Sequence, residues 1–142
     1  MGKKRVIKKA GQEGEGSARS SGKSSKRRLD AGVLHVNATY NNTYVVLTDG
    51  EGKVVASSSS GALGFSGSKK GTPFAASKVG ELLADKALGF GLKEIDVVIR
   101  GVGAGRESAM RSFVAKGINI NTIKDETPVP FNGPKAPRAR RV

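Results

Sequence analysis

The positively charged residues of this chain are concentrated at its two ends, and this distribution confines a folded domain to the middle. Residues 1–28 carry a net charge of +8 and residues 134–142 carry +4, whereas residues 29–133 carry only +1 of the formal net charge of +13. After Ile7 the first segment has almost no large apolar residue, so burial cannot offset the entropy lost on ordering it. We predict a basic, flexible arm over residues 1–28, a globular domain over 29–126 and an extended basic tail over 127–142.

The excess of cations favours a polyanionic partner. The 142 residues include 25 Lys and Arg but only 12 Asp and Glu, which gives an isoelectric point of about 10.4. Such a charge is self-repelling unless phosphates neutralise it. Because the runs at both ends have one sign, we interpret them as nucleic-acid-binding segments rather than as solubilising tails. The candidate contacts in these segments are Lys23, Lys26, Arg27, Arg28, Lys135, Arg138, Arg140 and Arg141.

Composition argues against several classes of protein. The chain has no cysteine and a single histidine, His35, so disulfides and Cys- or His-rich metal sites are not expected. It lacks an apolar run of about 18 residues, and its basic N-terminus lacks an apolar segment, so neither a membrane span nor a secretory signal is predicted. A transit peptide stays open as an alternative, because residues 17–28 are rich in Ser, Arg and Lys.

The domain begins with a pattern typical of three short strands. Alternating or β-branched residues predict strands over 33–38, 44–48 and 54–58. Asn41-Asn42 tolerates positive φ and fits a tight reversal after the first strand, while Asp49-Gly50-Glu51-Gly52 is a strong hairpin signal after the second. Together these segments predict an antiparallel meander.

A first helix is predicted after a long loop. The loop, residues 57–71, is rich in Ser, Gly and Lys, and long loops in compact domains are usually functional. Thr72-Pro73 suits the start of a helix, and Gly89 and Gly91 suit its end. The expected apolar face comprises Phe74, Ala75, Val79, Leu82, Leu83 and Ala87.

The remaining pattern completes an α/β fold. Residues 95–99 predict a central strand, residues 106–116 a second helix and residues 118–122 a last strand. Prolines from Pro128 onward keep the tail extended. The order β-β-β-α-β-α-β predicts a mixed five-stranded sheet with two helices, built around a right-handed β-α-β crossover.

The end of the long loop has the composition of a phosphate-binding segment. It combines two lysines, small hydroxyls and glycines just before a helix N-terminus, so a phosphodiester backbone can approach closely and be neutralised. Phe65 suits either stacking on an unpaired base or a role as a hydrophobic anchor under the loop. The candidate contacts are Phe65, Gly67, Ser68, Lys69, Lys70 and Thr72, with Asn41, Asn42 and Thr43 from the first reversal.

The glycine-rich segment from Gly101 to Ser108 follows a predicted strand and opens a helix. Backbone N–H groups at such a turn favour an anion. A dinucleotide site would need its last glycine where Arg106 stands, and the lysine of a P-loop is absent. Two interpretations stay open: the glycines only allow a tight turn, or the segment, with Arg106, contacts RNA phosphate. Binding of a nucleotide cofactor is much less favoured.

Signatures of catalysis are weak. Asp49 and Asp96 are expected at strand ends beside turns, and they do not supply the converging carboxylates that a two-metal hydrolase needs. His35 is the only histidine and alternates within a strand, where a packed or hydrogen-bonded role is more common than catalysis. We therefore predict that the protein is not an enzyme and has no metal and no cofactor.

Asn132-Gly133 is a candidate site of chemical modification as well as of RNA contact. Glycine after asparagine leaves the next amide free to attack the side chain, which forms a succinimide that can reopen as isoaspartate. An ordinary turn is the alternative interpretation of this dipeptide.

Five segments carry a resemblance to a known family. They are residues 35–43 (HVNATYNNT), 64–76 (GFSGSKKGTPFAA), 103–108 (GAGRES), 127–133 (TPVPFNG) and 138–142 (RARRV). In this order they resemble the bacterial family of the eleventh protein of the small ribosomal subunit. The likeness spans about residues 29–142, and residues 1–28 match only as a generic basic arm.

The chain departs from the pattern of that family at three positions. The family usually has histidine where Asn37 and Phe131 stand, and a small polar residue where Gly71 stands. At Phe131 the change exchanges a hydrogen-bonding side chain for a stacking one. The changes at positions 37 and 71 are expected to be tolerated, because they keep small or polar character.

The resemblance implies a ribonuclease H-like α/β topology without catalytic acids. It implies a structural, cytoplasmic protein in the ribosome that bridges helices of the small-subunit, 16S-type rRNA on the platform. The implied surroundings are the mRNA exit, the cleft for the Shine-Dalgarno helix, and the seventh and eighteenth small-subunit proteins; contact with initiation factor three is also implied. No membrane partner is implied.

Two other functions are weighed against this one. A sequence-independent nucleic-acid chaperone outside the ribosome would use the same cationic ends, but it would not need the Asn-Gly and Gly-Arg-Glu-Ser segments. A nucleotide-binding enzyme built on residues 101–105 would show saturable binding of nucleotides in dialysis.

Overall fold

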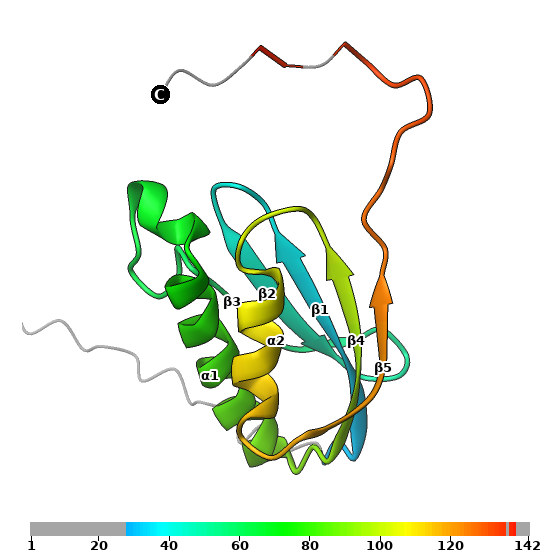
Figure 1. The fold of residues 1–142 in the computed structure, drawn as a ribbon. Coiled ribbons are helices and arrows are strands. Elements are labelled where there is room, and N and C mark those ends of the chain that lie inside the picture. The colour runs from blue at the N-terminus through cyan, green and yellow to red at the C-terminus, as the bar shows by residue number, and fades with distance from the viewer. Residues whose placement is uncertain (1–27, 136, 139–142) are drawn as a thin grey trace, which may run out of the picture.

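The computed structural model describes residues 28–135 together with residues 137 and 138. It contains five strands, two α-helices and one short 3-10 helix (Figure 1). The elements are β1 (Ala31–Ala38), β2 (Thr43–Thr48), β3 (Val54–Ser59), η1 (Gly67–Gly71), α1 (Pro73–Phe90), β4 (Glu94–Arg100), α2 (Arg106–Val114) and β5 (Asn119–Asp125). The predicted order of strands and helices is confirmed. The predicted N-terminal arm lies outside the described residues, except for Arg28.

The strands form a single mixed sheet in the order β3-β2-β1-β4-β5. β1 pairs antiparallel with β2, and β2 pairs antiparallel with β3, as expected for strands joined by short turns. β4 is parallel to β1 and to β5, because α1 carries the chain back before β4 and α2 carries it back before β5. This is the predicted ribonuclease H-like topology.

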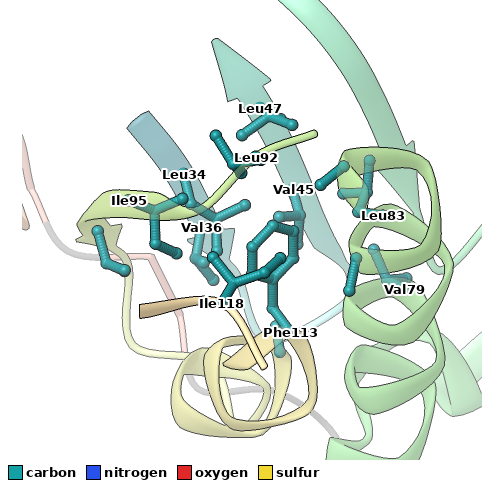
Figure 2. Close-up of a cluster of buried hydrophobic side chains, with 14 of the residues drawn as sticks. Leu34, Val36, Val45, Leu47, Val79, Leu83, Leu92, Ile95, Phe113 and Ile118 are labelled. Atoms are coloured by element: carbon teal, nitrogen blue, oxygen red, sulfur yellow. The ribbon is translucent and has the colours of Figure 1, made fainter. Parts of the chain in front are cut away.

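Both helices cover the same face of the sheet and enclose the core with it (Figure 2). Leu34, Val36, Val45 and Leu47 alternate along β1 and β2 and meet side chains of both helices, including the fully buried Phe113. The opposite face of the sheet presents residues such as His35 and Tyr44, and no described helix covers it. The sheet is therefore half-buried, which explains the alternation of its outer strands.

The first helix begins at Pro73 after the N-cap Thr72, as predicted, and differs from its prediction in part at its C-terminal end. Gly89 lies inside α1, and Gly91, with φ of 82°, ends it. The expected apolar face is wrong at Phe74 and Leu82, whose exposed fractions are 63% and 36%. Phe74 precedes Ala75 by one residue, and about 100° of rotation carries it off the buried stripe.

Three smaller predictions also need correction. Asn41 and Asn42 do not have positive φ; instead the hydroxyl of Thr39 closes the turn, donating to the carbonyl of Asn42 and accepting from its N–H. The long loop is partly ordered as η1. Asp96 lies within β4 and accepts a hydrogen bond from Thr122 on β5, rather than standing at a strand end.

Candidate nucleic-acid interface

Three connecting segments meet at the edge of the sheet where β1, β3 and β4 end (Figure 1). They are the β1–β2 turn (39–42), the segment between β3 and α1 (60–72) and the loop between β4 and α2 (101–105). We call this surface the loop edge. The tail leaves β5 at the same edge, because β5 is parallel to β4. The sequence therefore brings its candidate loops together only through the topology of the sheet.

Glycines allow these segments to approach one another. A Cβ at Gly71 would come within 3.0 Å of the Tyr40 carbonyl, and one at Gly103 would come within 3.0 Å of the Thr39 carbonyl. The N–H of Gly103 donates to the carbonyl of Ala38 at 2.8 Å. The turn between residues 39 and 42 is thus held between the other two segments. Close packing accounts for these glycines, whereas their contact with RNA phosphate stays a prediction.

Both α-helices begin at the loop edge, so their N-terminal ends face it. Thr72 is the N-cap of α1, and its hydroxyl accepts from the N–H of Ala75 at 3.3 Å. Gly105 precedes α2 and has no side chain to cap it. The N-terminal end of a helix carries a partial positive charge, so both helices favour an anion at this edge.

Two lysines of the loop edge have no acidic partner among the described residues, unlike several cations elsewhere on the domain. Lys78, Arg111 and Lys116 form ion pairs with Glu81, Glu107 and Asp85. Lys69 and Lys70, in η1, form no ion pair within the part of the chain that the structure describes. Their charge is therefore not neutralised by described protein groups, as a phosphate-binding segment requires.

Aromatic side chains are exposed beside these lysines. Tyr40 is 72% exposed and Phe74 is 63% exposed. Phe65 is half-buried and packs edge to face on Phe74, with ring centroids 6.0 Å apart, which favours the anchoring role that the sequence left open. Tyr40 and Phe74 were not among the predicted contacts. Exposed aromatics are typical platforms for unpaired bases, and the position of Tyr40 beside the Asn41-Asn42 turn was the available signal.

Arg106 is placed differently from a free RNA-binding cation. Its guanidinium donates to the carbonyl of Gly101, to Thr127 Oγ1 at 3.3 Å and to Asp125 Oδ2 at 2.5 Å. The hydroxyl and N–H of Thr127, together with Arg106, lower the pKa of Asp125 to about 2. Arg106 therefore joins the β4–α2 loop to the start of the tail. Its predicted contact with RNA stays untested.

The structure separates the other predicted contacts. Thr43 is fully buried against Gly105, so its side chain is not on the surface where RNA contact was predicted. Arg28 lies beside Phe90 at the C-terminal end of α1, away from the loop edge. Gly67 and Ser68 are exposed in η1, and Asn42 is half-buried in its turn. The remaining predicted contacts outside the described residues are Lys23, Lys26, Arg27, Arg140 and Arg141.

The described part of the tail is exposed. Phe131 is 95% exposed, and Lys135 and Arg138 form no ion pair with any described residue. Asn132 has φ of 57°, the left-handed conformation that asparagine tolerates better than most residues. Asn132-Gly133 therefore forms a bend in an otherwise extended segment.

The described residues contain no group of three or more His, Asp or Glu side chains that could hold a metal ion. None of their helices is both long and apolar enough to span a membrane. His35 is half-buried, and its ring Nε2 is 3.3 Å from Thr48 Oγ1, consistent with the expected hydrogen-bonded role in a strand.

Comparison with protein families gives a match over most of the chain. The family model described as ribosomal protein S11 matches residues 32–141, which include all five strands except the first residue of β1, both helices and most of the tail. This match agrees with the resemblance found in the sequence segments and with the ribonuclease H-like topology. The chain belongs to the ribosomal protein S11 family, the family of a structural, rRNA-binding protein of the small ribosomal subunit.

Proposed function

We propose that the loop edge and the tail of this protein hold helices of small-subunit rRNA together on the platform of the subunit. The observation that carries the proposal is the pair Lys69 and Lys70, which have no described acidic partner and stand beside exposed aromatic rings and two helix N-termini. This arrangement provides charge for phosphates and stacking surfaces for unpaired bases. The cationic tail adds contacts from the same edge.

The basic arm, residues 1–28, and the tail, residues 127–142, are proposed to thread between rRNA helices. Their fourteen Lys and Arg would neutralise phosphates that otherwise keep the helices apart. If about ten phosphates are engaged, log affinity should fall with log salt concentration at a slope of roughly −7 to −9. A much shallower slope would argue against engagement of both ends.

Family membership supports a finer proposal for the location of the protein. The proposed site lies near the mRNA exit and the cleft for the Shine-Dalgarno helix, in the cytoplasm, next to the seventh and eighteenth small-subunit proteins. Contact with initiation factor three belongs to the same proposal. No catalytic step is proposed for the chain.

Fractionation of native lysate tests the function directly. Sucrose-gradient peaks would be washed in high salt and quantified by mass spectrometry. Near one copy per small subunit, surviving the wash, is the expected result. Recovery only in free or DNA-bound fractions would instead favour a sequence-independent nucleic-acid chaperone. Cross-linking in the recovered subunits would then identify the rRNA helices and the neighbouring proteins.

A further inference from the structure

Residues 125–127, at the end of β5 and just after it, are tied to β4 and to the start of the β4–α2 loop and α2. The N–H of Glu126 donates to the carbonyl of Ile99 at 2.9 Å, and the N–H of Gly101 donates to Thr127 Oγ1 at 3.2 Å. Arg106 adds its bonds to Asp125, Thr127 and the carbonyl of Gly101. Apart from the bond between Arg106 and Gly101, these contacts join residues 19 to 27 positions apart in the sequence. We call Arg106, Asp125 and Thr127 the tail clamp.

The hydroxyl of Thr127 is fully used within the clamp. It donates to Asp125 Oδ1 at 2.6 Å and accepts from Gly101 N and Arg106 Nη1. A hydroxyl has one proton to donate and two lone pairs to accept with, so this geometry satisfies it completely. Asp125 Oδ1 also accepts from the N–H of Thr127 at 3.0 Å. Both the backbone and the side chain of Thr127 are therefore fixed relative to β4 and β5.

The tail has no other attachment to the domain in the described range. From Pro128 to Lys135, and at residues 137 and 138, no hydrogen bond or ion pair joins it to the strands or helices. Pro128 restricts Thr127 to an extended backbone, so the clamp and this proline together set the direction in which the tail leaves the sheet.

We propose that Arg106, Asp125 and Thr127 are positioning residues that aim the tail, so that its cations and the loop edge reach one RNA surface together. This inference rests on the proposed rRNA binding. The ion pair between Arg106 and Asp125 is partly exposed, with exposed side-chain fractions of 29% and 53%, and such pairs contribute only modestly to folding stability. Two linked binding segments reinforce each other only when their geometry allows simultaneous engagement.

A thermodynamic cycle in the full-length chain tests the inference. Thr127→Val would be made in the natural chain and in a chain whose tail charges are removed by Lys135→Gln, Arg138→Gln, Arg140→Gln and Arg141→Gln. Binding to transcribed small-subunit rRNA would be measured for each. We expect Thr127→Val to weaken binding about tenfold in the natural chain and less than about twofold in the tail-neutral chain. Equal losses of affinity in both chains, or no loss in either, would overturn the proposal that the clamp aims the tail.

Matched variants separate aiming from general damage. Thr127→Ser keeps the hydroxyl and should bind like the natural chain. Thr122→Val removes a similar hydroxyl bond to a carboxylate, from Thr122 to Asp96 at 2.7 Å, but lies away from the tail and should also leave affinity unchanged. If the natural chain does not bind the rRNA at all, both the proposed function and the clamp are wrong. If the natural chain binds but Thr127→Val does not change its affinity, only the clamp is wrong.

A distance measurement reports the direction of the tail without RNA. Because the chain has no cysteine, Lys86→Cys on α1 and Val129→Cys in the tail would be the only labelling sites for a pair of spin labels. We expect a narrow distance distribution that broadens with Thr127→Val but not with Thr127→Ser. An equally narrow distribution in Thr127→Val would contradict the inference.

Discussion

Gly71 lies against the backbone of Tyr40 so closely that a Cβ at position 71 would come within 3.0 Å of the Tyr40 carbonyl oxygen. This contact joins η1 to the β1–β2 turn and so holds two of the three segments of the loop edge. A side chain at position 71 has no room, because the neighbouring atom is backbone and cannot rotate away.

The first prediction concerns this contact. Gly71→Ala should destabilise the domain by about 1–3 kcal/mol, as overpacking of a close backbone contact does. Gly61→Ala is the matched control, because a Cβ there would meet Lys70 Cδ at 3.7 Å and Ser59 Oγ at 3.9 Å, which are ordinary contacts. Urea unfolding followed by circular dichroism would measure both free energies. Equal stability of the two variants would show that the turn shifts to make room.

The second prediction concerns the lysines of η1. Replacing Lys69 and Lys70 by glutamine should reduce the slope of log affinity against log salt by roughly 1.5, because two phosphate contacts are lost. The control replaces Lys86 and Lys93 by glutamine and should leave the slope unchanged. These two lysines also lack an ion pair within the described residues. Filter binding to small-subunit rRNA at several salt concentrations measures this. Equal slopes for both double variants would remove Lys69 and Lys70 from the interface.

The third prediction concerns stacking at the loop edge. Tyr40→Ala should weaken RNA binding by about 1–3 kcal/mol if the ring stacks on an unpaired base, with little change in unfolding free energy because the side chain is 72% exposed. Tyr44→Ala removes the same side chain from β2, on the open face of the sheet, and should have a smaller effect on binding. A larger loss of RNA affinity for Tyr44→Ala than for Tyr40→Ala would indicate that RNA binds the open face of the sheet instead of the loop edge.

The fourth prediction concerns pH. The pKa of Asp125 is lowered from 3.8 to about 2 by Thr127 and Arg106, so the folded state favours the charged carboxylate. The stability contributed by this group is therefore fully present above about pH 4 and is lost as pH falls through about 2. An NMR titration of the Asp125 carboxyl carbon would follow it. Thr127→Val should raise this pKa more than Arg106→Gln does, because the Thr127 hydroxyl is the largest cause. The opposite ranking would show that the charge of Arg106 dominates.

The fifth prediction concerns Asn132. Its left-handed backbone and the following glycine favour attack of the next amide on the side chain, so isoaspartate should accumulate at this position on incubation. Enzymatic methylation of isoaspartyl carboxyls, followed by peptide mapping, would measure it. Asn121, which a threonine follows in β5, is the internal control. An unmodified residue 132 in aged protein would leave the dipeptide as an ordinary bend.

Most of the secondary structure could be predicted because it depends on local patterns. Alternation in β1, the Thr72-Pro73 start of α1 and the αL glycine at Gly91 are each encoded by neighbouring residues. Family motifs added the topology. Errors arose where a local pattern allowed two outcomes, as for Phe74, which has the composition of a core residue but lies off the buried stripe.

The sequence by itself determined the order of the elements, the cationic ends and the family, since these depend on residue type and on spacing along the chain. Only the tertiary structure decided that Thr43 is buried, that Gly71 has no room for a side chain and that Arg106 binds Asp125. The physical reason is separation: each of these contacts joins segments that are distant in sequence, and no local periodicity records which of them the sheet will bring together.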